Sequence, residues 1–161
     1  MSLSNLGPEL HSSRSFSGQP VPQQLVLELL NDAVWAPNDG LREPWRFIYA
    51  DNSSGGRLSG LQEPAPAYLI MVMKEESDSY KRDEDFAAVC CLMQNFQLLA
   101  CERKLGVRRT MNDWIYDRKH MAALGVQDKE RIAAVLEIGF WDEAAGEVPS
   151  AKVTEVKFEL L

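Results

Sequence analysis

Seven consecutive residues that are almost all strongly apolar, AYLIMVM at 67–73, stand between Pro66 and the charged run KEESDS. A strand with one face in water would alternate apolar and polar side chains, whereas this run does not alternate. Continuous apolar runs of this length are typical of strands that are covered on both faces. We therefore expect residues 67–73 to form the central strand of the sheet.

The residues before this strand predict a helix and a further strand. Residues 22–36 place leucines and other apolar residues at helical spacing after Pro22, and proline is favourable where a helix begins. Pro37 helps to end that helix, because the residue before a proline avoids the α-region. The segment WRFIYA at 45–50 predicts a short strand.

The second half of the chain predicts two more helices and two strands. A long helix runs from residue 82 to a glycine cap at Gly106, and the segment 110–125 is a loop leading into a helix that ends at Gly125. Residues 131–141 predict a strand. The residues at 151–160 alternate imperfectly, which predicts an edge strand or one exchanged with another subunit.

The long helix contains no charged residue between positions 86 and 101. A helix that is apolar nearly all round must be buried on more than one side. We expect it to lie deep in a core or between subunits.

The composition is that of an ordinary globular protein. The chain has 161 residues, of which 45% are hydrophobic and 25% are charged, so we expect one domain over residues 1–161. No apolar run reaches the length of a membrane span and the N-terminus has no apolar signal core, which makes the cytoplasm the default location and a membrane partner unexpected. A net charge of -7 argues against nucleic acid as a partner.

Residue types that form self-sufficient active sites are scarce. The sequence has two histidines and lacks HExxH, GxSxG, P-loop and GxGxxG motifs. Its three cysteines, at 90, 91 and 101, lack CxxC spacing, so we expect small apolar packers and no metal site. If the protein is an enzyme, a cofactor supplies its chemistry and no catalytic side chain is predicted.

Two segments could face a ligand. LHSSRSF at 10–16 gathers hydroxyls, a histidine and an arginine, which suit a small phosphate, although a polar N-terminal tail is the alternative. WAPNDGLREPWRF at 35–47 cannot be a regular helix, so its backbone groups are free to face a ligand. We expect Trp35 and Trp45 to anchor the two ends of this loop in the core.

The chain resembles the FMN-dependent nitroreductase family in four segments that occur in the family's order. They are HSSRSF, the Pro-containing loop WAPNDGLREPWRF at 35–47, the helix DFAAVCCLMQNFQLLACERKLGV and the strand ERIAAVLEIGF. The loop is most similar to that of small bacterial members with an APNxGLREPWRF-type sequence. The resemblance implies an α+β fold with a mostly antiparallel central sheet flanked by helices. It also implies an intertwined homodimer with FMN at the subunit interface, where the long uncharged helix forms the dimer core and the C-terminal strand reaches the partner.

The resemblance assigns cofactor-binding positions in the N-terminal and C-terminal segments. His11, Ser12 and Arg14 match the family's motif for the FMN phosphate and ribityl chain, and Lys152 matches a late basic residue. Leu10 stands where the family has an arginine and Ser150 where it has a further basic residue, which weakens the phosphate site.

The resemblance also places two loops beside the flavin ring. Pro37, Asn38 and Asp39 would lie against the ring, and Thr110, Asn112 and Asp113 near its N5 edge. Asp39 would disfavour the anionic reduced flavin because like charges repel at short range. The connection after the first strand is shorter than in the family, so its helical insert is reduced and the pocket more open.

Two functions follow from these residues. The first is an FMN-dependent NAD(P)H oxidoreductase that transfers hydride by a ping-pong reaction to nitroaromatic, quinone or related small-molecule acceptors. The second is a degenerate dimer of the same fold that binds flavin weakly or not at all and acts as a binding or structural protein. The substitutions at Leu10, Asp39 and Ser150 and the shortened insert favour the second.

Overall fold

The computed structural model describes residues 14–51, 65–111, 113–144 and 157–159. Their centre is a four-stranded sheet in the order β1-β2-β4-β3, in which every neighbouring pair is antiparallel. The strands are β1 (Trp45–Asp51), β2 (Ala67–Lys74), β3 (Leu105–Thr110) and β4 (Glu130–Phe140). The predicted antiparallel sheet is therefore confirmed, and the apolar run at 67–73 forms an interior strand.

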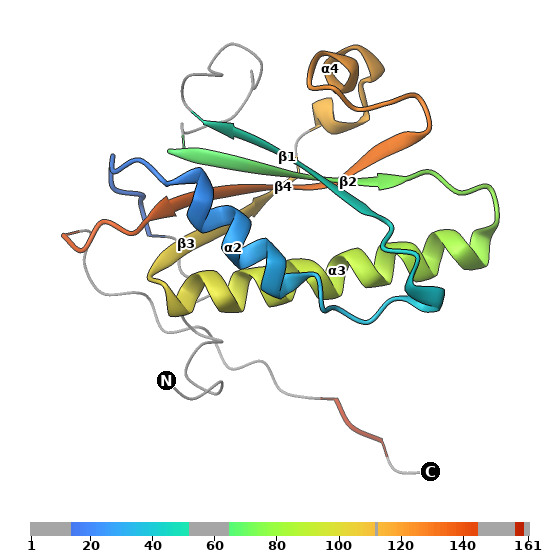
Figure 1. Cartoon of the computed structure of the whole chain (residues 1–161), viewed down its shortest axis with the longest axis horizontal. Helices are drawn as coiled ribbons and strands as arrows, with labels where there is room; N and C mark the ends of the chain where they lie inside the picture. The colour runs from blue at the N-terminus through green and yellow to red at the C-terminus, as the bar shows by residue number, and fades with distance from the viewer. Residues whose placement is uncertain (1–13, 52–64, 112, 145–156, 160–161) are drawn as a thin grey trace.

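Helices cover both faces of this sheet (Figure 1). α2 (Gln23–Ala33) and α3 (Ser79–Glu102) pack on one face, while the 3-10 turn η3 (Asp113–Tyr116) and α4 (Arg118–Ala123) lie on the other. β2 contributes alternate side chains to both cores, Leu69 and Met71 on the α3 side and Ile70 and Val72 on the α4 side. This double burial explains why the segment lacks polar alternation.

The predicted end of the long helix was wrong by a few residues. α3 ends at Glu102, and Lys104 rather than Gly106 takes the left-handed conformation, with φ of 58°. Gly106 lies inside β3, a strand that the sequence pattern did not predict. β3 pairs with the end of β4, where Gly106 stands opposite Gly139.

Among the residues that the structure describes, α3 is buried along one side. Val89, Leu92 and Phe96 lie in the core against the sheet, whereas Cys91 and Gln94 are exposed on the opposite side. The expected burial on more than one side is therefore not seen among the described residues of one chain. The exposed side of α3 between residues 86 and 101 carries no charged residue.

The two loop tryptophans differ in burial. Trp45 packs against the α3-side core, as expected for an anchor. Trp35 is 87% exposed, so its predicted role as a core anchor was wrong for the single chain. It follows the C-cap of α2, Val34, and its ring lies on the surface.

Most of the predicted C-terminal strand lies outside the described residues. Of positions 151–160, the structure describes 157–159, which are exposed and form no strand. Within the described part of the chain, no helix combines the length and the apolar character needed to cross a membrane.

Candidate functional site

The first described residues, 14–17, here called the N-terminal segment, cross the end of the sheet beside β4. Ser17 N donates to the Phe140 carbonyl at 2.7 Å, and Asp142 N donates to the Ser15 carbonyl at 3.0 Å. The two bonds flank an antiparallel bridge between Phe16 and Trp141. This pairing fixes the start of the described chain, including Arg14, to the end of β4.

A glycine pair allows two aromatic rings to lie on the sheet at this point. A Cβ on Gly106 would come within 2.4 Å of the Trp141 ring, and one on Gly139 within 2.7 Å of the Phe16 ring. The two rings stack with centroids 5.1 Å apart. Any side chain at either glycine would displace a ring, so this close approach depends on both glycines.

Of the predicted phosphate ligands, Arg14 is the one that lies within the described residues. Its Nε atom is buried, and none of the described residues accepts a hydrogen bond from it. A buried guanidinium nitrogen without an acceptor favours an anionic ligand, because an unsatisfied buried donor is costly. The other predicted phosphate ligands, His11, Ser12 and Lys152, lie outside the described residues, as do Leu10 and Ser150.

One face of β3 extends from the aromatic pair toward the second predicted cofactor segment. Gly106, Arg108 and Thr110 alternate along the strand and so share this face, and Thr110 is about 13 Å from Gly106 along it. Asp113 begins η3 shortly after Thr110, while Asn112 lies outside the described residues. The N-terminal segment and Thr110 are thus joined by one strand.

Arg108, which the sequence analysis did not single out, lies between the two segments. Its Nε donates to Glu137 at 2.5 Å, and its guanidinium lies 5.0 Å from the Phe16 ring centroid. Glu137 is buried with 4% exposure and needs this partner, because an unpaired buried carboxylate is strongly unfavourable. Alternation along β3 could have placed Arg108 on this face, had the strand been predicted.

The Pro-containing loop lies at the other end of the molecule. The turn η1 (Asp39–Leu41) is held to α3 through Arg42 and Asp85, near the beginning of that helix. From Asp85 to Glu102 the helix rises about 26 Å, and β3 starts just beyond its end. Figure 1 shows the loop before β1 beside the green start of α3, with β3 near its yellow end. One chain therefore does not bring the loop and the N-terminal segment together.

Within this loop the charge of Asp39 is paired. Arg42 Nη1 donates to Asp39 Oδ2 at 2.6 Å, while Arg42 Nη2 and Nε donate to Asp85 Oδ1 at 2.7 and 3.1 Å. These two carboxylates raise the pKa of Arg42, Asp85 having the larger effect. From the sequence, Asp39 was expected to add a negative charge beside the flavin, and in the structure its counter-ion Arg42 lies three residues away. Pro37 is exposed and Asn38 is half-buried.

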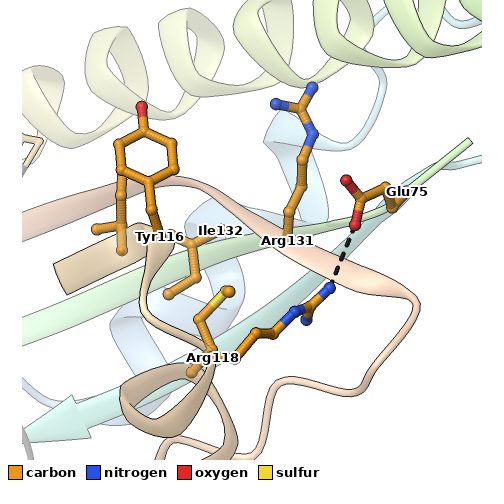
Figure 2. A pocket seen from close by; sticks show the side chains of 7 residues that line it. Glu75, Tyr116, Arg118, Arg131 and Ile132 are labelled. Carbon is orange, nitrogen blue, oxygen red and sulfur yellow. Dashed lines mark hydrogen bonds and ion pairs between the residues drawn. The ribbon is translucent and has the colours of Figure 1, made fainter. Parts of the chain in front are cut away.

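A cavity of about 270 Å³ lies apart from these segments (Figure 2). Arg118 spans it to reach Glu75 at 3.2 Å, and Arg131 points away toward α3, where its guanidinium lies 5.2 Å from the Phe86 ring centroid. Arg118 and Glu75 are thus paired with each other, while the buried Nε of Arg131 has no acceptor among the described residues. None of the predicted cofactor residues that the structure describes is among its lining residues, which are Glu75, Ile115, Tyr116, Arg118, Met121, Arg131 and Ile132.

Comparison with known proteins gives a consistent family. Residues 10–59 match the family model described as the nitroreductase family. A Bacillus subtilis protein named "Putative NAD(P)H nitroreductase YfhC" is 35% identical over an alignment of 157 positions, which covers 83% of this chain and 81% of that protein.

Solved structures share the fold over the whole chain. The crystal structure of a nitroreductase-like family protein from Bacillus cereus superposes with a TM-score of 0.87 at 33% identity, covering 100% of this chain and 96% of the other. An FMN and NADPH-dependent nitroreductase, NfnB from Sphigopyxis sp. strain HMH, superposes with a TM-score of 0.73 at 18% identity, covering 99% and 100% of the two chains. The second likeness concerns the fold alone.

Proposed function

Because this chain belongs to the nitroreductase family, we propose that it is an FMN-dependent NAD(P)H oxidoreductase acting on nitroaromatic, quinone or related acceptors. The observation that carries the proposal is the buried Arg14 Nε, which has no acceptor among the described residues. The structural relative NfnB is named as FMN- and NADPH-dependent, which is the precedent for the cofactor and the electron donor.

Among the described residues, the buried and unpartnered Nε of Arg14 is compatible with a phosphate-bearing flavin cofactor. Arg14 would hold its phosphate or ribityl end together with His11, Ser12 and Lys152, because a guanidinium binds phosphate through charge-assisted hydrogen bonds. Thr110, Asn112 and Asp113 would supply backbone groups to the ring. The single strand between the two segments supports this assignment, since β3 keeps them at a fixed separation.

Bound FMN would supply the redox chemistry, accepting hydride from NAD(P)H and passing it to the second substrate in a ping-pong cycle. The protein's own contribution is to bind, orient and tune. Arg14 provides positive charge at the cofactor, and the Arg108 and Glu137 pair keeps the intervening face of β3 polar but neutral. No side chain is assigned as a catalytic acid.

We infer that the remaining predicted ligands meet the flavin from a second subunit. Pro37, Asn38 and Asp39 lie at the opposite end of α3 from Arg14, so one flavin would meet the loop of one subunit and the N-terminal segment of its partner. A homodimer that packs the exposed, uncharged side of α3 would join the two ends. In this arrangement residues 1–161 act as one domain per subunit. The partner subunit would also cover the ring of Trp35, which is exposed in one chain.

The visible absorption spectrum of the purified protein tests this function. We expect a flavin band, present as purified or after adding FMN and desalting, that bleaches with NADPH and returns with a quinone. A colourless protein that does not retain FMN would refute the proposal and would favour the degenerate dimer, for which Leu10 is the clearest sequence argument.

A further inference from the structure

The turn after Asn38 adopts an unusual backbone. Gly40, Leu41 and Glu43 all have positive φ, at 59°, 52° and 46°. This conformation suits glycine but is unfavourable for leucine and glutamate, whose Cβ atoms crowd the backbone. Such a turn persists only where surrounding contacts impose it.

The contacts that impose it come from Arg42 and Asn38. The Asn38 side chain accepts from Glu43 N at 3.0 Å and donates to the Ala36 carbonyl at 3.3 Å, which closes the turn locally. Among the described residues, Arg42 links this turn to the body of the protein, since it donates two hydrogen bonds to Asp85 on α3. Asp85 is 4% exposed, so its position is fixed by the helix and the core.

The same guanidinium neutralises Asp39. The 2.6 Å contact at Nη1 uses a different part of the fork from the two bonds to Asp85, so both carboxylates are bound at once. Only arginine has enough donors in a fixed plane to do this. Without it, an unpaired carboxylate would stand on the surface that is assigned to the flavin ring.

We propose that Arg42 is a positioning residue for the flavin, which fixes the backbone of residues 38–43 through Asp85 and cancels the charge of Asp39. This inference rests on the proposed function, because it requires the loop to face FMN. It gives Arg42 two effects that can be measured separately. The first is on the affinity for FMN, through the shape of the loop, and the second is on the flavin potential, through charge.

The experiment compares FMN dissociation constants and midpoint potentials of holoenzyme variants. For Arg42→Gln we expect FMN binding to weaken by about tenfold or more, as misplaced binding groups do. We also expect the midpoint potential to fall, because an unpaired Asp39 disfavours the anionic reduced flavin. A tenfold greater loss of affinity for reduced than for oxidised FMN corresponds to a fall of about 30 mV.

Asp39 variants separate charge from shape. In Asp39→Asn the bonds between Arg42 and Asp85 remain, so the loop should keep its shape while the potential rises above the wild-type value. In the double variant with Arg42→Gln the potential should return toward wild type, although FMN affinity stays low. This second series also covers the case in which Arg42→Gln alone folds poorly.

Arg118→Gln is the matched control, because Arg118 also ties a loop to the body, through Glu75 and the carbonyls of residues 127, 128 and 130. It should leave both flavin measurements at wild-type values. If Asp39→Asn and Arg42→Gln leave the potential unchanged, or if Arg118→Gln weakens FMN binding as much as Arg42→Gln, the inference is overturned. If the wild type binds no FMN, the proposed function itself fails and the inference falls with it.

Discussion

At the scale of single residues, the pair of Gly106 and Gly139 shows how a missing side chain can organise a site. Each glycine lies under a ring that no Cβ could clear, and those rings tie the N-terminal segment to the sheet. The position of Arg14 therefore depends on two residues that make no polar contact with it. This dependence can be measured through stability as well as through binding.

Gly139→Ala should lower the free energy of unfolding by about 1–3 kcal/mol, because the new Cβ overpacks against Phe16. Gly18→Ala is the matched control, since a Cβ at Gly18 meets nothing within 4 Å. Its effect should stay within about 0.5 kcal/mol. Urea unfolding of both variants makes the comparison, and equal stabilities would show that the ring of Phe16 moves aside without cost.

Arg14 itself is tested by Arg14→Ala. We expect its dissociation constant for FMN to rise by more than about tenfold, because the variant removes a charge-assisted contact to phosphate. The stability of the apoprotein should change little, since the Nε atom of Arg14 has no acceptor among the described residues. Fluorescence titration with FMN gives the constant, and an unchanged value would remove Arg14 from the phosphate site.

The pair of Arg46 and Glu130 predicts an acid-dependent loss of stability. The hydrogen bond from Arg46, followed by smaller contributions, holds the pKa of Glu130 below its ordinary value of 4.5. A lowered pKa in the folded state means that the stabilisation is complete above the unfolded pKa and is lost as the pH falls through the folded value. Wild type should therefore exceed Glu130→Gln in stability at neutral pH, and the gap should close below pH 4.5. A gap that is constant with pH, measured by thermal unfolding, would contradict this.

At the scale of elements, the strands that the sequence predicted are those whose burial is visible in their own residues. β1, β2 and β4 were predicted because apolar runs mark a buried strand. β3 was missed because its six residues, LGVRRT, include two arginines and a glycine, which do not form an apolar run. These residues are accommodated in the strand by distant partners, since Glu137 pairs with Arg108 and the Trp141 ring covers Gly106. Contacts with distant residues leave no periodic signal.

The candidate site was predictable to the same extent. Arg14 could be named from a motif, whereas the link from Arg42 to Asp85 joins residues 43 positions apart and depends on how α3 lies against the loop. Trp35 was misplaced for a related reason. An aromatic residue at a helix end predicts burial, but this ring is 87% exposed in the chain as described.

α3 gives the prediction that belongs to this scale. Its exposed side carries Ala87, Cys91, Gln94, Leu98 and Cys101, at alternating spacings of four and three that form a continuous uncharged stripe. Gln94→Lys should convert the proposed dimer to monomer, because the two copies would bury lysines against an apolar seam. Lys81→Glu, on an exposed part of the first helical turn, is the control and should remain dimeric. Size-exclusion chromatography with light scattering distinguishes them, and a dimeric Gln94→Lys would place the interface elsewhere.

At the scale of the whole molecule, the two halves of the predicted cofactor site lie at opposite ends of α3. This separation is a property of one chain, and it makes a flavin site shared between subunits necessary if both halves contact the same flavin. A site shared between subunits can be distinguished from a site within one subunit by complementation. Two variants that each bind FMN poorly can form a mixed dimer in which one site is intact.

Co-expression of Arg14→Ala with Gly40→Val provides that test. The first change damages the N-terminal half of the site, and the second strains the loop, because Gly40 has φ of 59° and valine is unfavourable there. Each homodimer should bind FMN poorly at both sites. In the mixed dimer one site receives both damaged halves and the other receives both intact halves, so purified mixed dimers, selected with two different tags, should retain one FMN per dimer. If the mixed dimers bind no more FMN than the parent variants, each site lies within one subunit and the separation along α3 must be bridged in another way.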